Sequence, residues 1–92
     1  MSKIPGELAN VKKGDIDLEI LRAAVIAELD AISLYEQMAA SSGNPDVRAV
    51  LLDIAREEKT HMGEFTTLLL RLDQEQAEEM KNGQKEVEEL LD

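Results

Sequence analysis

The sequence contains no cysteine, so it forms neither disulfide bonds nor thiolate metal sites. A chain of 92 residues buries only a modest core unless disulfides, metal ions or oligomerisation assist. With disulfides excluded, metal binding and self-association remain as additional sources of stability. The lack of cysteine also fits the reducing interior of a cell.

Long apolar runs and aromatic residues are scarce as well. No run is long enough to cross a membrane, and no apolar segment after Met1 resembles a secretory signal, so we expect a soluble, cytoplasmic protein without membrane contact. Tyr35 and Phe65 are its only aromatic residues of the Phe, Tyr and Trp types. A small aliphatic core of this kind favours packed helices over sheets.

Basic residues are outnumbered, because 10 Lys and Arg face 20 Asp and Glu and give a formal net charge of −10. A charge of this sign repels the phosphate groups of nucleic acids, so we expect no nucleic-acid partner. The same field attracts cations, although an acidic surface most often serves solubility.

Proline and glycine divide the chain into segments. Residues 1–14 combine them with polar residues and show no sustained periodicity, which predicts a flexible N-terminal arm. From an N-cap at Asp15 or Asp17, residues that favour helix continue up to a turn at residues 41–45. The chain therefore opens on one long helix.

A second long helix follows this turn. Asn44 as cap with Pro45 in the first turn is a strong start signal, and the helix is expected to continue to about Leu72. Asp73, with Gln76 three residues later, resembles a capping box that opens a shorter helix.

Asn82 and Gly83 are expected to interrupt that third helix. The predicted fold is therefore all-α, an antiparallel two-helix hairpin plus a short C-terminal helix. Residues 15–82 form this domain, and residues 83–92 form an acidic tail or linker.

Each long helix carries an apolar stripe whose members follow alternating steps of three and four residues and so share one face. Only Glu28, Glu58 and His61 on these stripes are expected to carry charge near neutral pH. The first stripe comprises Leu18, Leu21, Val25, Glu28, Ile32, Tyr35 and Ala39. The second comprises Val47, Leu51, Ile54, Glu58, His61, Phe65, Leu68 and Leu72.

The two glutamates lie at one level of the hairpin. Glu28 precedes Gly43 by 15 residues and Glu58 follows it by 15. At ~1.5 Å of rise per residue, each stands about 22 Å from the turn, so the carboxylates can face each other. His61 shares the face of Glu58 at a spacing of three residues.

Burying such groups among aliphatic side chains costs several kcal/mol per unpaired charge. No Lys or Arg occupies either stripe, so a metal ion is the simplest source of compensating charge. A lone glutamate at such a position more often controls helix register, and a lone histidine is more often a hydrogen-bonded core residue. The combination of all three favours metal binding.

The set is half of a known arrangement. Helical bundles that hold two iron or manganese ions take one Glu from each of two helices and one Glu-x-x-His from each of the other two. A second copy related by a two-fold axis would complete a four-helix bundle, so we expect at least a homodimer with a shared di-iron centre. Such a centre suits oxidation of Fe(II) by oxygen or peroxide.

Two alternatives remain open on these residues. A redox-silent zinc or manganese site would stabilise a structural helical dimer with the same ligands. In the other, the hairpin oligomerises through its stripes without metal, and the three polar residues set its register.

The residues also carry a family resemblance. The segments LRAAVIAELDAISLYEQM (21–38) and VRAVLLDIAREEKTHMGEFTTLLL (47–70) resemble the encapsulated ferritin family. They are especially similar to the ferritin-like domain that some archaea fuse to an encapsulin shell protein. The likeness continues weakly into LDQEQAEEMKNG (72–83).

This resemblance implies a ferroxidase centre formed by Glu28, Glu58 and His61, with Tyr35 close by. It implies a ring-shaped decamer of five dimers, confined inside an encapsulin nanocompartment that stores the oxidised iron. Some relatives also place an acidic pair for iron uptake beside the first-helix ligand, at positions that are Ala27 and Asp30 here.

Ala27 cannot ligate metal, whereas Asp30 is expected to keep part of this metal-binding role. Iron uptake is therefore expected either to be weaker or to use Glu36, Glu57 or Glu64 instead, although a solvated surface position is the commoner role for such residues. A flavin-binding relative is disfavoured, because the chain has no Trp for ring stacking.

Overall fold

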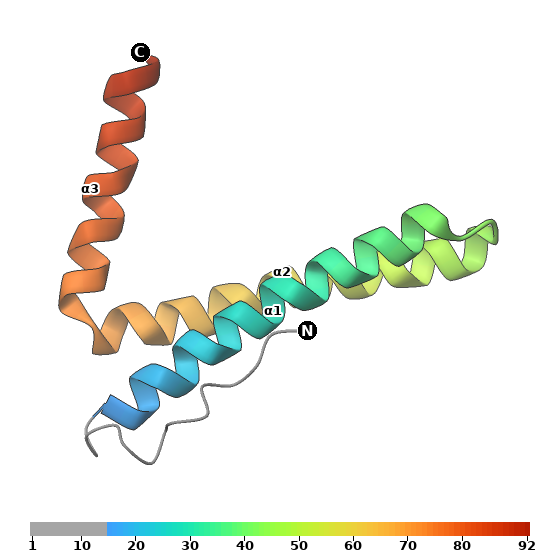
Figure 1. The fold of residues 1–92 in the computed structure, drawn as a ribbon, viewed down its shortest axis with the longest axis horizontal. Helices are drawn as coiled ribbons and strands as arrows, with labels where there is room; N and C mark the ends of the chain where they lie inside the picture. Colours follow the sequence, from blue (N-terminus) through green and yellow to red (C-terminus); the bar gives the residue numbers. More distant parts are fainter. Residues whose placement is uncertain (1–14) are drawn as a thin grey trace.

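The computed structural model describes residues 15–92, which form three helices (Figure 1): α1 (Ile16–Ser41), α2 (Pro45–Leu72) and α3 (Gln74–Leu91). Helices α1 and α2 run antiparallel and pack side by side, while α3 turns a sharp corner and projects away from them. The predicted all-α fold with a helical hairpin is confirmed. The expected flexible arm, residues 1–14, lies outside the described residues.

Helix α2 begins as its sequence predicts. The Asn44 side chain accepts hydrogen bonds from the backbone N–H groups of Asp46 at 2.9 Å and Val47 at 3.2 Å, and Pro45 occupies the first turn. These bonds satisfy donors that a helix start otherwise leaves free. Asp15 precedes α1 in the cap position, but its side chain makes no capping hydrogen bond.

Backbone carbonyls at the C-terminal end of α1 accept hydrogen bonds from a side chain of α2. No basic residue lies in the last turn of α1. Arg48 instead donates to the backbone carbonyls of Ala39 at 3.1 Å and Ser42 at 2.8 Å. A guanidinium at the C-terminal carbonyls of a helix complements the helix dipole, so Arg48 stabilises the closed end of the hairpin.

The predicted interruption of α3 is wrong, because the helix continues through Asn82 and Gly83 to Leu91. A single glycine costs a helix only about 1 kcal/mol relative to alanine. Side-chain hydrogen bonds along the helix flank this point, from Asn82 to Glu79 at 3.2 Å and from Gln84 to Glu88 at 3.0 Å. Residues 83–91 are therefore helical, and their role as a linker stays a prediction.

The core lies between α1 and α2. All seven members of the first stripe are buried or half-buried, as predicted. The predicted burial of the second stripe is wrong at its ends, because Val47, Leu68 and Leu72 are exposed. Ala55 and Leu69, which are not members of the stripe, are buried instead. A strict 3.5-residue repeat drifts by ~20° per heptad around a straight helix of 3.6 residues per turn. The buried face of α2 therefore moves off the predicted stripe.

None of the helices in residues 15–92 combines the length and the apolar character needed to span a membrane.

Candidate metal centre

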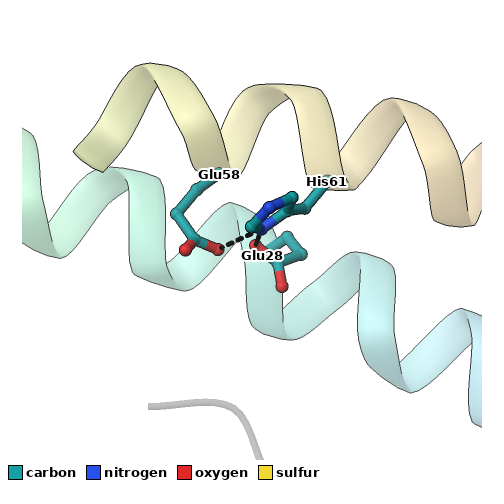
Figure 2. A group of neighbouring side chains, drawn as sticks. All are labelled: Glu28, Glu58 and His61. Atoms are coloured by element: carbon teal, nitrogen blue, oxygen red, sulfur yellow. Dashed lines mark ion pairs between the residues drawn. The ribbon is translucent and has the colours of Figure 1, made fainter. Parts of the chain in front are cut away.

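Three side chains from two helices converge in the middle of the hairpin (Figure 2). Glu28 reaches from α1, while Glu58 and His61 reach from successive turns of α2. The His61 Nδ1 atom lies 3.6 Å from Glu58 Oε2 and 4.0 Å from Glu28 Oε2. One ligand atom from each residue lies within 4.8 Å of the others, and the described residues contain no second cluster of this kind.

The local sequence explains this convergence. Glu58 and His61 stand three residues apart, so one helical face presents both. Glu28 belongs to the buried stripe of α1 and lies at the same level of the antiparallel pair. The structure thus brings together the three residues that the sequence selects.

The two carboxylates are shielded from water. The Glu28 side chain is 18% exposed and that of Glu58 is 20% exposed. The Oε2 atom of Glu28 is fully buried and has no hydrogen-bond partner. A buried acceptor left without a donor destabilises a fold by about 1–3 kcal/mol.

Apart from His61, the basic side chains that form ion pairs on α1 and α2 pair with other acids and not with these two carboxylates. Lys59 pairs with Glu36 at 3.0 Å, and Arg22 pairs with Glu19 and Asp73. Arg56 hydrogen-bonds Asp53 at 2.7 Å, and this bond lowers the pKa of the Asp53 carboxyl.

The donor set therefore fits a metal ion. Two carboxylates and one imidazole are ligands that iron, manganese and zinc accept, and the buried Glu28 oxygen needs a positive partner. These three side chains would hold the ion between the helices.

His61 differs from the glutamates because its side chain is 48% exposed. The sequence predicts a buried imidazole, and in a single chain this is wrong. Steps of four and seven residues place Val50, His61, Leu68 and Leu72 on one face of α2, and the three apolar members are exposed. The centre therefore borders an apolar surface that one hairpin leaves uncovered.

Tyr35 and Asp30 lie outside the three-residue cluster. Tyr35 follows Glu28 by seven residues on the same stripe, which places its Cα about 10 Å further along α1. Both residues line an open surface pocket with Ala27 and Leu34. A metal-binding role for Asp30 and a catalytic role for Tyr35 stay predictions.

The proposed substitutes for the missing carboxylate are not equivalent. Glu36 is already engaged by Lys59. Glu57 and Glu64 are exposed and flank His61, one turn before and one turn after it on α2.

Comparisons with known proteins cover nearly the whole described chain. Residues 19–91 match the Rubrerythrin family. The chain is 64% identical over 73 residues to the ferritin-like-encapsulin shell fusion protein of Pyrococcus furiosus, covering 79% of this chain and 21% of that one. It is 41% identical over 61 residues to the encapsulin nanocompartment cargo protein EncC of Myxococcus xanthus, covering 66% and 47%.

A solved structure is similar as well. The crystal structure of the encapsulated ferritin domain from Pyrococcus furiosus superposes with a TM-score of 0.84 and 55% identity, covering 98% of this chain and 95% of that one. The chain thus spans almost all of the solved domain but less than half of each of the two longer relatives.

Proposed function

Because this chain belongs to the rubrerythrin family, and within it to the encapsulated ferritins, we propose that it oxidises Fe(II) to Fe(III) at a di-iron centre shared by two copies. The observation that carries this proposal is the cluster of Glu28, Glu58 and His61 around a buried carboxylate oxygen without a donor. One chain supplies one Glu and one Glu-x-x-His. The two-fold-related copy supplies the other half of the six ligands.

The exposed surface beside His61 supports the homodimer. Val50, Leu68 and Leu72 would leave water when a second hairpin covers this face. The same contact would bury the half-exposed imidazole, as the sequence pattern requires. The interface and the metal centre therefore form together, and metal binding stabilises the dimer.

The residues have separate roles in this chemistry. Glu28 and Glu58 bind Fe(II) through hard carboxylate oxygens, and their charge stabilises the Fe(III) product more than the Fe(II) substrate. His61 binds as a neutral imidazole and leaves the charge balance unchanged. Two Fe(II) ions at adjacent positions can each give one electron to dioxygen or peroxide. The apolar members of the first stripe on either side of Glu28 limit the access of water to the metal centre.

Helix α3 supports an assembly larger than a dimer. It has 18 residues and buries none of them, and Val87, Leu90 and Leu91 near its C-terminal end are exposed. Most of the stability of a helix in a protein comes from packing its apolar face, so a partner surface is needed to hold α3. We propose the decamer of five dimers that encapsulated ferritins imply.

The partners are proposed from the relatives. The Pyrococcus furiosus protein is named as a fusion to an encapsulin shell, and the Myxococcus xanthus protein as an encapsulin cargo. Two helices enclose no mineral, so storage of the oxidised iron needs an outer shell. We place this chain in the cytoplasm, inside an encapsulin nanocompartment.

The test is a stopped-flow measurement of Fe(III) formation in air. Unsubstituted chain is expected to accelerate Fe(II) oxidation, and Glu58→Gln or His61→Ala is expected to remove most of that acceleration. Glu89→Gln is the matched control, because it removes an exposed carboxylate of α3. Equal rates for all four proteins would refute a ferroxidase. Tight metal binding and dimer formation without faster Fe(II) oxidation would instead support the structural zinc or manganese dimer.

A further inference from the structure

The methionines of residues 15–92 occupy different environments. Met38 and Met80 are 39% and 50% exposed, whereas Met62 is half-buried. Met62 follows His61 directly and comes four residues after Glu58, so it lies one helical turn from that carboxylate. It thus stands next to two of the three residues of the candidate metal centre.

Met62 is half-buried and lies on the buried side of α2 rather than on its uncovered face. It lies seven residues from Ala55 and seven from Leu69, and these are the two buried residues of α2. A seven-residue spacing keeps all three on nearly the same side of the helix. Met62 is therefore expected on the side of α2 that faces α1, where its half-buried side chain has limited contact with bulk solvent.

The proposed reaction supplies an oxidant at this position. Two Fe(II) ions give one electron each to dioxygen, which takes up two protons and becomes hydrogen peroxide. A thioether sulfur attacks one peroxide oxygen, the O–O bond breaks, and a sulfoxide and water result. The sulfur loses two electrons and the peroxide gains them.

We infer that Met62 is oxidised to methionine sulfoxide during turnover, and that this oxidation limits the working life of the centre; the inference rests on the proposed function. A sulfoxide is polar and chiral, so it disrupts the packing of a core side chain. The damaged seam would displace Glu58 and slow later turnovers. Exposure to bulk solvent alone would favour oxidation of Met80 instead.

The experiment compares two peptides of one sample. Successive portions of Fe(II) are added in air, Fe(III) formation is recorded, and tryptic digests are analysed by mass spectrometry. Trypsin releases the two methionines separately, in residues 60–71 and 72–81. During turnover we expect sulfoxide to accumulate faster at Met62 than at Met80. With added peroxide, chelator and no iron, we expect the reverse order.

The outcomes separate the two proposals. A failure to accelerate Fe(II) oxidation would refute the proposed function. Acceleration with Met80 oxidised as fast as Met62 would overturn the present inference and leave the function intact. Catalase in solution removes escaped peroxide, so oxidation of Met62 is expected to persist in its presence and that of Met80 to fall.

A variant pair tests the consequence for the working life. Met62→Leu conserves volume and removes the thioether. We expect the same initial rate as the unsubstituted chain but a smaller loss of rate over successive Fe(II) additions, whereas Met80→Leu should decay like the unsubstituted chain. Equal decay in both variants would show that Met62 oxidation does not limit the centre.

Discussion

At the scale of single residues, two side chains of the candidate centre are in unfavourable environments in the metal-free single chain. Glu28 is half-buried and its buried Oε2 atom has no hydrogen-bond donor, while His61 is half-exposed on an apolar face. A bound cation would compensate the charge of Glu28, and a second copy of the chain would cover His61. The cluster is therefore suited to metal-dependent assembly and poorly suited to stability as an empty monomer.

Glu28→Gln is expected to make the metal-free chain more stable. The change removes one of two neighbouring carboxylates and introduces N–H donors, so the free energy of unfolding in chelator should rise by about 1 kcal/mol. With metal present the sign should reverse, because a ligand is lost. Urea denaturation with and without metal measures both values. Destabilisation in chelator would contradict the role assigned to Glu28.

At the scale of elements, two polar contacts position the helices. Arg48 joins the closed end of the hairpin, and Asp73 joins α3 to α1. One oxygen of Asp73 accepts from the Gln76 backbone N–H at 3.0 Å, and the other lies 3.1 Å from Arg22. Asp73 therefore both caps α3 and ties the corner to α1.

Substitution of Arg48 by methionine is expected to destabilise the hairpin. It keeps much of the apolar stem but removes both hydrogen bonds to backbone carbonyls, which should cost about 1–2 kcal/mol. Arg56→Met is the control, because the ion pair of Arg56 with Asp53 is exposed and should contribute little. Chemical denaturation compares the two variants. Equal destabilisation in the two variants would show that the hydrogen bonds of Arg48 to the backbone carbonyls do not stabilise the hairpin.

Two substitutions at Asp73 separate its roles. Asp73→Asn preserves the cap but removes the ion pair, whereas Asp73→Ala removes both, and the lost cap should cost about 1 kcal/mol more. Hydrogen exchange of the first amides of α3 is expected to be fastest in the alanine variant. If both variants exchanged alike, capping by Asp73 would not hold the start of α3.

At the scale of the whole molecule, the packing of the helices leaves many large apolar side chains exposed for a chain of this size. Two leucines of α2 distinguish one face from the other. Leu68, which is 48% exposed, lies seven residues from His61 and shares its face. Leu52, which is 47% exposed, lies nine residues away, or two and a half turns, and faces the opposite side.

Leu68→Glu is therefore expected to prevent dimerisation, because it places a charge in the proposed interface, and to abolish acceleration of Fe(II) oxidation. Leu52→Glu should keep the dimer. Analytical ultracentrifugation gives the mass of each variant, and circular dichroism checks that both remain helical. A Leu68→Glu dimer with full activity would rule out this face as the shared one.

Metal removal is expected to weaken the same dimer. Since the ligands come from both copies, chelator should shift the chain toward monomer, and added Fe(II) without oxygen should restore the dimer. Native mass spectrometry follows both changes. A dimer indifferent to chelator would favour the hairpin that assembles without metal.

The sequence by itself determined the features that depend on neighbouring residues. Asn44 and Pro45 mark the start of α2, and equal distances from the turn bring Glu28 level with Glu58, because caps and helical rise are local properties. The family resemblance found in these helices is confirmed.

Only the tertiary structure decided what depends on how the helices pack. It showed that α3 passes through Asn82 and Gly83, that the buried face of α2 drifts from the predicted stripe, and that His61 stays half-exposed in one chain. The tertiary structure also buries the Oε2 atom of Glu28 without a hydrogen-bond partner. Burial is set by the real helical pitch and by the surfaces that meet across the hairpin, and a local sequence pattern specifies neither.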